Sequence, residues 1–381
     1  MLVSPSKTRK PLLFIQIALL YCSVSDDLYA QKDSVPLFTT LRMEVRADFS
    51  FQHPMTRFAD GSLEHGEDAY GFAGKYFNIH VGGNIGKKVS YYFRQRVVAN
   101  PGSVRFFDNT DFLYINYAIN PNWSLRFGKE ALAVGGFEYD AAPIDVLFCS
   151  YYWDNFYCFQ LAASGAYHTR DGKHSIIAQV GASPYLHYGS FYKNSLMSYN
   201  LMWSGNFGHF QTLYSINMFE RERGKFMNYI ALGNKLKFKK WDLYVDLIHH
   251  ATHVGQLMRD FAVISCANVY FNDYVNLFVK GGYEQNFDRD EILHYRNTEE
   301  LWDCLALPGQ QYFFGGLGVE IRPKACPDIR IHAFAADFCT RDYAQPIAAD
   351  LSDADVATQH GVTANVGLTW NINFLKYLQK Q

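Results

Sequence analysis

After its first thirty residues the chain lacks any apolar run of the roughly eighteen residues that a membrane helix needs. Mean hydropathy is only -0.17, although 17% of the residues are aromatic. Aromatic richness without long apolar runs is typical of a membrane barrel, in which only every second residue meets lipid. The composition therefore favours strands over helices as membrane-crossing elements.

The chain also lacks a strong charge bias, since its formal net charge is -2. We find no basic arm or helix of the kind that binds phosphate backbones, so we expect no nucleic-acid partner. No GxSxG, HExxH, P-loop or dinucleotide fingerprint occurs in a usable context, so we expect neither an enzyme nor a cofactor. Internal repeats of the propeller or solenoid type are absent as well.

Cysteine is scarce and scattered, with no CxxC pair to suggest a metal or redox site. Export would permit disulfides, but the spacing favours use as small packing residues. Six cysteines follow the N-terminal segment: Cys149, Cys158, Cys266, Cys304, Cys326 and Cys339.

Polar clusters that could hold a metal are weak. His249, His250 and His253 are close in sequence, but strand neighbours point to opposite faces, which favours packing or solvated roles. Acidic groups in two long connections could bind Ca²⁺ or could simply be solvated. They are Asp288, Asp290 and Glu291, and then Asp350, Asp353 and Asp355.

The N-terminal segment has the pattern of a secretory signal. Lys7, Arg9 and Lys10 precede an apolar run over 12–22, and Ala30 ends a small-residue cleavage pattern. We expect cleavage after Ala30, which leaves 31–381 as the mature chain. A short N-terminal membrane anchor is the alternative.

The stretch 362–374 alternates almost without error, with Val366, Leu368 and Trp370 on one face and Asn365 and Thr369 on the other. A strand has this period of two when one side meets an apolar phase and the other meets water. The pattern resembles the terminal strand by which bacterial outer-membrane barrels are recognised for insertion. A soluble sandwich ending in such a strand is the alternative.

The same alternation recurs along the chain and predicts an all-β, antiparallel, up-and-down transmembrane barrel of about sixteen strands. The predicted strands cover 41–51, 77–85, 89–99, a segment ending at 119, 123–128, 156–168, 174–182, 196–207, 210–219, 226–238, 241–249, 261–271, 274–287, 312–321, 329–338 and 362–374.

Connections between these strands alternate between short and long, as in outer-membrane barrels with periplasmic turns and external loops. The long ones include 52–76, 129–155, 288–311 and 340–360, and both termini would then be periplasmic. Aromatic residues such as Trp123, Phe238 and Trp241 collect beside the short turns, where a membrane boundary favours them.

Sixteen strands leave a lumen too wide for side chains to fill, so an aqueous channel is expected. The alternation places a set of basic residues on the inner wall, where guanidinium groups could pass an anion from site to site. The other interpretation is that they pair with Glu44 and Asp48. The predicted pore-lining residues are Arg42, Arg46, Arg94, Arg96, Arg126, Lys235, Lys237, Lys280 and Arg330.

One segment carries a family resemblance. The run 125–129, LRFGK, followed by GGFEY at 135–139, resembles the strand-to-loop signature of the phosphate-selective porins O and P. The resemblance implies a homotrimer whose third external loop, 129–155 here, folds into the lumen as a constriction and which passes phosphate or other solutes. The matching positions are Arg126, Gly128, Lys129, Gly136 and Glu138.

The chain departs from a phosphate-binding constriction in the charge of that loop. Between 130 and 155 there is no Lys or Arg, so the loop would repel phosphate. Its acidic residues are Glu130, Glu138, Asp140, Asp145 and Asp154. The aromatic group that includes Tyr151, Tyr152 and Trp153 could guide sugars or peptides, or could anchor the loop to the wall.

These observations predict a porin in the outer membrane of a Gram-negative bacterium, in contact with lipid and passing small hydrophilic solutes by diffusion, with anions such as phosphate among them. Two alternatives stay open. The barrel could be an adhesin or a component of an uptake or export machine. A barrel lipase is the other, although no Ser lies in an obvious pairing with His168, His174 or His209.

Overall fold

The computed structural model describes residues 35–58, 60–97, 107–185, 196–256, 258–298, 306–342 and 358–378. The predicted signal peptide lies outside these residues. Within them, sixteen antiparallel strands form a closed barrel, and a short extra strand, β2, pairs with the end of β1. The predicted fold class and strand number are therefore confirmed.

The strands are β1 (Thr40–Arg57), β2 (Leu63–His65), β3 (Ala69–Ile85), β4 (Val89–Arg96), β5 (Thr110–Ala118), β6 (Trp123–Ala131), β7 (Phe159–His168), β8 (His174–Ala182), β9 (Met197–Phe207), β10 (Phe210–Glu222), β11 (Lys225–Lys237), β12 (Trp241–Ala251), β13 (Asp260–Asn272), β14 (Val275–Asn286), β15 (Gln310–Ile321), β16 (Ile329–Asp342) and β17 (Thr358–Asn373). The helical elements are α2 (Phe137–Asp140), η1 (Pro143–Asp145), α3 (Tyr151–Asn155), η2 (Val254–Gln256), α4 (Arg289–Thr298) and α5 (Phe374–Leu378).

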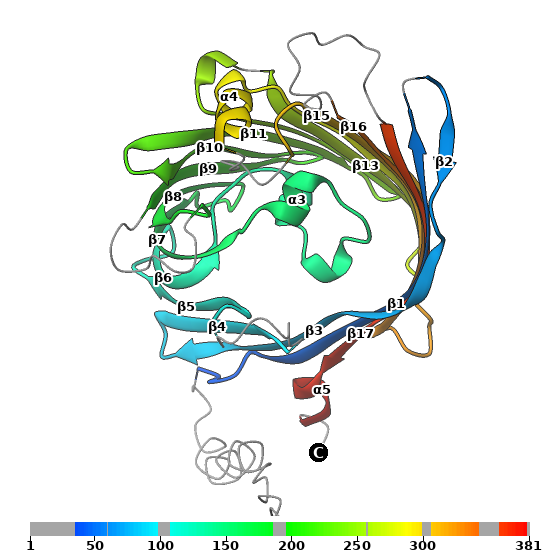
Figure 1. The fold of residues 1–381 in the computed structure, drawn as a ribbon. Helices are drawn as coiled ribbons and strands as arrows, with labels where there is room; N and C mark the ends of the chain where they lie inside the picture. The colour runs from blue at the N-terminus through cyan, green and yellow to red at the C-terminus, as the bar shows by residue number, and fades with distance from the viewer. Residues whose placement is uncertain are drawn as a thin grey trace, which may run out of the picture.

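Closure of the sheet depends on β1, which pairs with β3 on one side and with β17 on the other (Figure 1). Arg42 lies opposite Asn373 of β17 and opposite His80 of β3. From β3 to β17 each strand pairs with the next strand in sequence, so the barrel has the up-and-down order that short hairpin turns impose.

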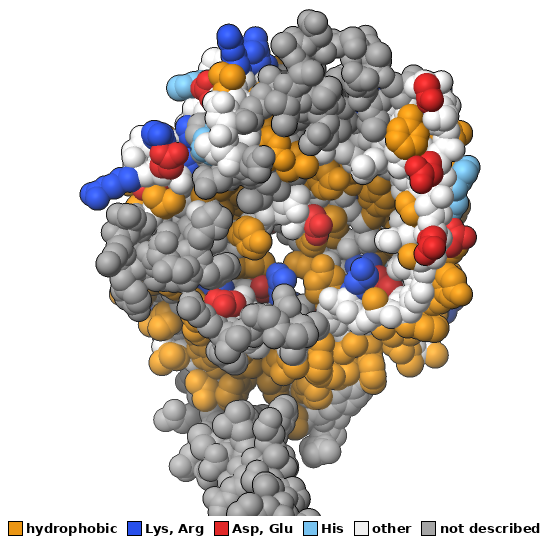
Figure 2. Space-filling model, viewed as in Figure 1, with side chains coloured by type: hydrophobic (Ala, Val, Ile, Leu, Met, Phe, Trp, Pro, Cys, Tyr) orange, Lys and Arg blue, Asp and Glu red, His pale blue; other side chains and the backbone are white. Residues whose placement is uncertain are grey.

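The apolar and polar residues that alternate in the sequence lie on opposite faces of the barrel wall, the outer and the inner face. On β17, Val366 and Trp370 are 57% and 44% exposed, whereas Asn365 and Thr369 are each 4% exposed. Figure 2 shows hydrophobic side chains gathered on the outer wall and charged side chains inside the opening. This arrangement places the apolar face where a membrane barrel meets lipid.

Several of the predicted boundaries were wrong. β6 continues to Ala131 and β7 begins at Phe159, so the connection predicted at 129–155 lies at 132–158, and β16 and β17 extend into the connection predicted at 340–360. The long connection 52–76 is largely strand, because β1 continues to Arg57 and β3 already begins at Ala69, with β2 between them. The first seven residues of β3 are exposed and include Ala and Gly, so they gave no alternation to detect. At the other end of the chain, Phe374 starts α5 instead of ending β17.

The segment between β6 and β7 turns into the barrel. In Figure 1 the part that carries α3 lies across the inside of the cylinder. Side chains from this segment and from β10 to β16 form a buried apolar cluster, which is the core of the molecule. In the described part of the chain, none of the helices has the length and apolarity to cross a membrane.

Candidate functional site: the lumen and its inserted loop

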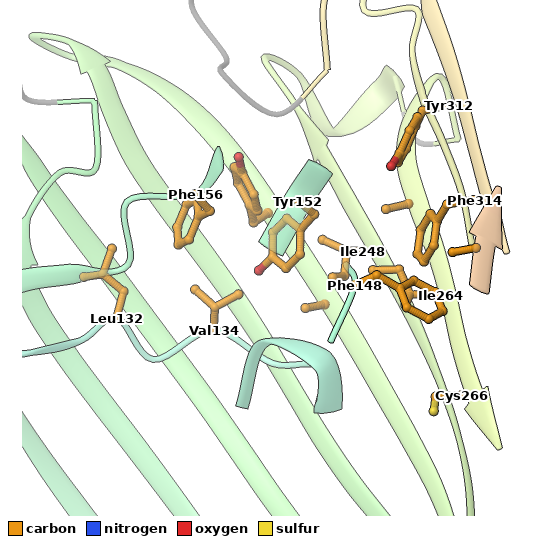
Figure 3. Packing of buried hydrophobic residues seen from close by; sticks show 14 of the residues in the cluster. Leu132, Val134, Phe148, Tyr152, Phe156, Ile248, Ile264, Cys266, Tyr312 and Phe314 are labelled. Atoms are coloured by element: carbon orange, nitrogen blue, oxygen red, sulfur yellow. The ribbon is translucent and has the colours of Figure 1, made fainter. Parts of the chain in front are cut away.

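The segment 132–158, here called the inserted loop, packs against one half of the inner wall. Tyr152 is fully buried, and Phe148 lies against Phe334 of β16 with ring centroids 5.2 Å apart. Figure 3 shows Leu132, Val134 and Tyr152 directed toward the wall strands. The sequence allowed two roles for the loop aromatics, namely guiding solutes or anchoring the loop to the wall. The burial of Tyr152 shows that this residue is an anchor.

Two wall carboxylates hold the starts of the two loop helices. Asp246 on β12 accepts hydrogen bonds from the backbone N–H groups of Phe137 and Glu138, at 2.9 and 2.8 Å. Glu284 on β14 accepts them from Tyr151 and Tyr152, at 2.7 and 3.0 Å. Backbone N–H groups at a helix start have no partner within the helix, so each carboxylate satisfies two of them.

Three of the predicted pore-lining basic residues bind this loop. The Lys280 ammonium lies 2.6 Å from Glu138 Oε1 and donates to the Phe148 carbonyl oxygen, also at 2.6 Å. Arg46 donates to the Val146 carbonyl oxygen at 2.7 Å. Arg330 forms an ion pair with Asp145 at 2.7 Å. All three are buried, because the loop covers them.

Gly128 and Gly136 of the family signature each occupy a conformation that L side chains rarely adopt. Their φ angles are 135° and 105°. A Cβ atom on Gly128 would lie 2.2 Å from the Leu113 carbonyl oxygen of β5, so the strand pairing itself requires a glycine there. Gly136 precedes α2, and a Cβ atom added there would lie 3.4 Å from Asp246 Oδ2.

The other half of the lumen stays open. A cavity of about 840 Å³ lies between the inserted loop and strands β3 to β8. Arg94 and Arg96 on β4 both bind Asp111 of β5, at 2.9 Å each. Arg126 on β6 forms an ion pair with Glu130 at 3.2 Å. These three arginines, predicted from the alternation, all line the cavity.

Aromatic rings support these guanidinium groups. Arg94 lies over Phe112 at 4.5 Å and over Phe159 at 5.0 Å, and Arg126 lies over Tyr114 at 4.4 Å from the ring centroid. A ring face attracts a cation and limits its conformations. The arginine heads are thus held in place beside the cavity even though about 40% of the side chains of Arg96 and Arg126 is exposed.

The cavity carries both signs of charge. Arg96 and Arg126 are exposed on the wall, and Asp140 and Asp154 are exposed on the loop. The surrounding protein limits the solvation of Asp140 and raises the pKa of its carboxyl group, against an opposing effect of Lys235. Of the other acidic residues predicted for the loop, Glu138 and Asp145 each pair with a base, and so does Glu130, which lies on β6.

The remaining predicted lining residues lie elsewhere on the wall. Arg42 is half-exposed and pairs with Glu44 at 3.2 Å. Lys235 lies 3.8 Å from Asp242, and Lys237 is exposed beside a short turn. Lys129 of the family signature is buried and donates to the Phe107 carbonyl oxygen at 2.8 Å.

Sequence reasoning missed the role of Asp111, which links two arginines. It also did not connect Asp246 or Glu284 with the loop that they hold. No sequence signal identifies such partners, because they depend on which strands become neighbours and on where the loop comes to rest.

The metal hypotheses gain no support from the described residues, since no group of three or more His, Cys, Asp or Glu side chains is placed to hold an ion. His250 instead lies 2.7 Å from Asp260, and Thr252 donates to Asp288. Asp350, Asp353, Asp355 and Cys304 lie outside the described residues. The five described cysteines are free thiols.

Comparison with known families supports the resemblance noted in the sequence. Residues 42–184 match the model of the family described as phosphate-selective porin O and P. The chain resembles this porin family. The match covers the first strands, the family signature and the whole inserted loop, whereas no curated protein matches the sequence.

Solved structures share the porin-like barrel at low identity. An anion-selective porin from Comamonas acidovorans has a TM-score of 0.57 and 11% identity, covering 87% of this chain and 99% of its own. OprB of Pseudomonas putida has a TM-score of 0.53 and 10% identity, covering 87% and 94%. The outer-membrane channel DcaP of Acinetobacter baumannii has a TM-score of 0.51 and 10% identity, covering 85% and 96%.

At such identities the likeness to these structures shows the fold alone. Together with the family match over residues 42–184, it supports a barrel of the porin type.

Proposed function

We propose that this protein is an outer-membrane porin through which small hydrophilic solutes diffuse passively. The observation that carries the proposal is the open cavity beside the inserted loop. The loop occupies the half of the lumen that faces β10 to β16 and leaves a charged, water-accessible space along β3 to β8. The short turns and both termini are assigned to the periplasmic side, as in barrels of this plan.

The lining suggests a channel with weak ion preference. Four basic and five acidic side chains line the cavity, so neither sign of charge dominates its electrostatic potential. They are Arg94, Arg96, Arg126 and Lys129, and Asp108, Asp111, Glu130, Asp140 and Asp154. An anion would move along Arg96 and Arg126, and a cation along Asp140 and Asp154. Phosphate is one of the solutes that can pass, and no basic group on the loop completes a phosphate site.

Planar-bilayer recording of the purified, heat-modifiable barrel tests this proposal. We expect stepwise openings and, in a KCl gradient, a reversal potential near zero. Liposome swelling with uncharged sugars of increasing size would then give the solute cut-off. A correctly folded barrel that gives neither conductance nor swelling would contradict the proposal. The homotrimer implied by the family resemblance is tested by the mass of the detergent-solubilised protein.

A further inference from the structure

The hairpin formed by β1, β2 and β3 carries a histidine pair that the channel does not use. It stands above the neighbouring strands at the end of the barrel where the long connections lie (Figure 1). His53 Nε2 lies 3.1 Å from His65 Nδ1, and the two rings have centroids 5.3 Å apart. The other ring nitrogen of His53, Nδ1, lies 2.5 Å from Asp68 Oδ1.

We propose that His53 and His65 together bind one divalent transition-metal ion of the Cu²⁺ or Zn²⁺ type, with Asp68 orienting His53. Two nitrogens bound to one such ion at about 2.0–2.1 Å lie roughly 2.9–3.4 Å apart for angles between square and tetrahedral. The distance between the two imidazole nitrogens falls inside this range. An ion can replace the shared hydrogen atom once each imidazole turns to point its lone pair at the ion, which lies off the line joining the two nitrogens.

The carboxylate beside His53 fits the same chemistry. A metal-binding histidine usually gives its other ring N–H to a carboxylate, which fixes the tautomer and directs the free nitrogen at the metal. With Asp68 accepting from Nδ1, the lone pair of His53 lies on Nε2, the nitrogen that faces His65. Asp68 is thus a positioning residue for the site.

The backbone holds the pair in register. His65 lies opposite Met55 in the β1–β2 pairing, and the Gly66 N–H donates to the Pro54 carbonyl oxygen at 2.9 Å. A side chain on Gly66 would meet the Pro54 ring at 2.8 Å, so this crossing is close-packed. The two imidazoles therefore come from adjacent, hydrogen-bonded strands, which lowers the entropy lost on chelation.

Exposure and donor type select the ion. The His53 side chain is 30% exposed and Asp68 52%, so an ion reaches the pair from solvent and keeps water at its remaining positions. Two imidazoles favour Cu²⁺, Ni²⁺ and Zn²⁺ over Ca²⁺ and Mg²⁺, with Cu²⁺ strongest in the usual order. The site is independent of the proposed transport function.

Titration of the detergent-folded protein with Cu²⁺ alone and Zn²⁺ alone, by calorimetry and by EPR for Cu²⁺, tests the proposal. We expect one strongest site whose EPR spectrum shows nitrogen splitting. His53→Ala or His65→Ala should weaken it at least tenfold, and Asp68→Asn should weaken it by about tenfold or more. His209→Ala is the control, because His209 is exposed and bonds only the Lys237 carbonyl oxygen among its described polar partners.

His65→Gln gives a second variant that keeps a polar side chain, and heat-modifiable gel mobility shows that each barrel is folded. Unchanged affinity and unchanged EPR spectra in the two histidine variants would overturn the proposed site. Unchanged affinity in Asp68→Asn would overturn the positioning role of that carboxylate. Equal weakening in His209→Ala would show that binding is not specific to this pair.

Discussion

The Lys280 ammonium lies 2.6 Å from Glu138 Oε1, with 6% and 0% of the respective side chains exposed. This ion pair joins wall strand β14 to the first helix of the inserted loop. Ser150 also donates to Glu138, so the pair connects both loop helices to the wall. The loop is therefore fixed by buried charge as well as by apolar packing.

Removing the base from this pair should release the loop. Lys280→Met leaves Glu138 buried without its cation, and breaking a buried ion pair in this way costs about 3–5 kcal/mol. We expect a lower unfolding temperature, faster proteolysis within the loop, and a larger, noisier single-channel conductance. Lys376→Met is the matched control, since the exposed Lys376–Asp328 pair should contribute about 0–1 kcal/mol.

The double variant Lys280→Met with Glu138→Gln separates charge from packing. Removing both charges should recover much of the lost stability, because no uncompensated carboxylate stays buried. If Lys280→Met alone were as stable as the unaltered protein and conducted identically, the loop would have to be held by other contacts.

The exposed charges of both signs in the cavity predict opposite shifts in ion preference when either sign is removed. Arg96→Gln with Arg126→Gln removes the two exposed bases and should make the channel prefer cations. Asp140→Asn with Asp154→Asn should make it prefer anions. Reversal potentials in a KCl gradient measure both, with Lys376→Gln as a charge change outside the lumen. Shifts of the same sign in the two double variants would contradict this account.

The channel should become more anion-preferring as the pH falls. Because limited solvation raises the pKa of Asp140, this carboxyl group takes up a proton at a higher pH than an ordinary aspartate. The cavity then loses one negative charge while its arginines stay charged. Reversal potentials measured from neutral pH downward should show an early shift that is missing in Asp140→Asn. An identical pH profile in that variant would exclude Asp140 as its source.

Gly128→Ala should destabilise the barrel, because the added Cβ would meet the Leu113 carbonyl oxygen and the backbone has a positive φ. Gly315→Ala on β15 is the control, since a Cβ there meets nothing within 4 Å. We expect Gly128→Ala to lower the temperature at which the barrel loses its compact gel mobility, and Gly315→Ala to change it little. If both substitutions lowered this temperature equally, the cause would be the loss of any strand glycine and not the contact with Leu113.

A charge on the outer wall should oppose membrane insertion. Leu317 on β15 is 63% exposed, and a Lys near the middle of the bilayer costs about 2–4 kcal/mol. Leu317→Lys should therefore reduce the folded fraction in lipid vesicles, measured by gel mobility. Gln359 is exposed on β17 near the long connections, so the control variant Gln359→Lys should fold normally. Normal folding of both variants would argue against a lipid-facing outer wall.

The sequence alone determined the strands and their two faces. Alternation such as that around Trp370 reports directly on an inner and an outer environment, because side chains alternate across a strand. It also placed Arg94, Arg96 and Arg126 on the inner face. The alternation did not predict the start of β3 at Ala69. The first residues of this strand are exposed on both faces, so neither face requires apolar side chains.

Only the tertiary structure decided which inner-face charges line the cavity and which hold the loop. Arg96 and Arg46 look alike in the sequence, yet one is exposed beside Asp111 and the other is covered by the carbonyl groups of the inserted loop. Glu138 and Asp140 differ in the same way although they are two residues apart, because Glu138 pairs with Lys280 of the wall and Asp140 lines the cavity. Ion pairing requires two groups within a few ångström, and for segments far apart in the chain only closure of the barrel and the resting place of the loop bring them that close.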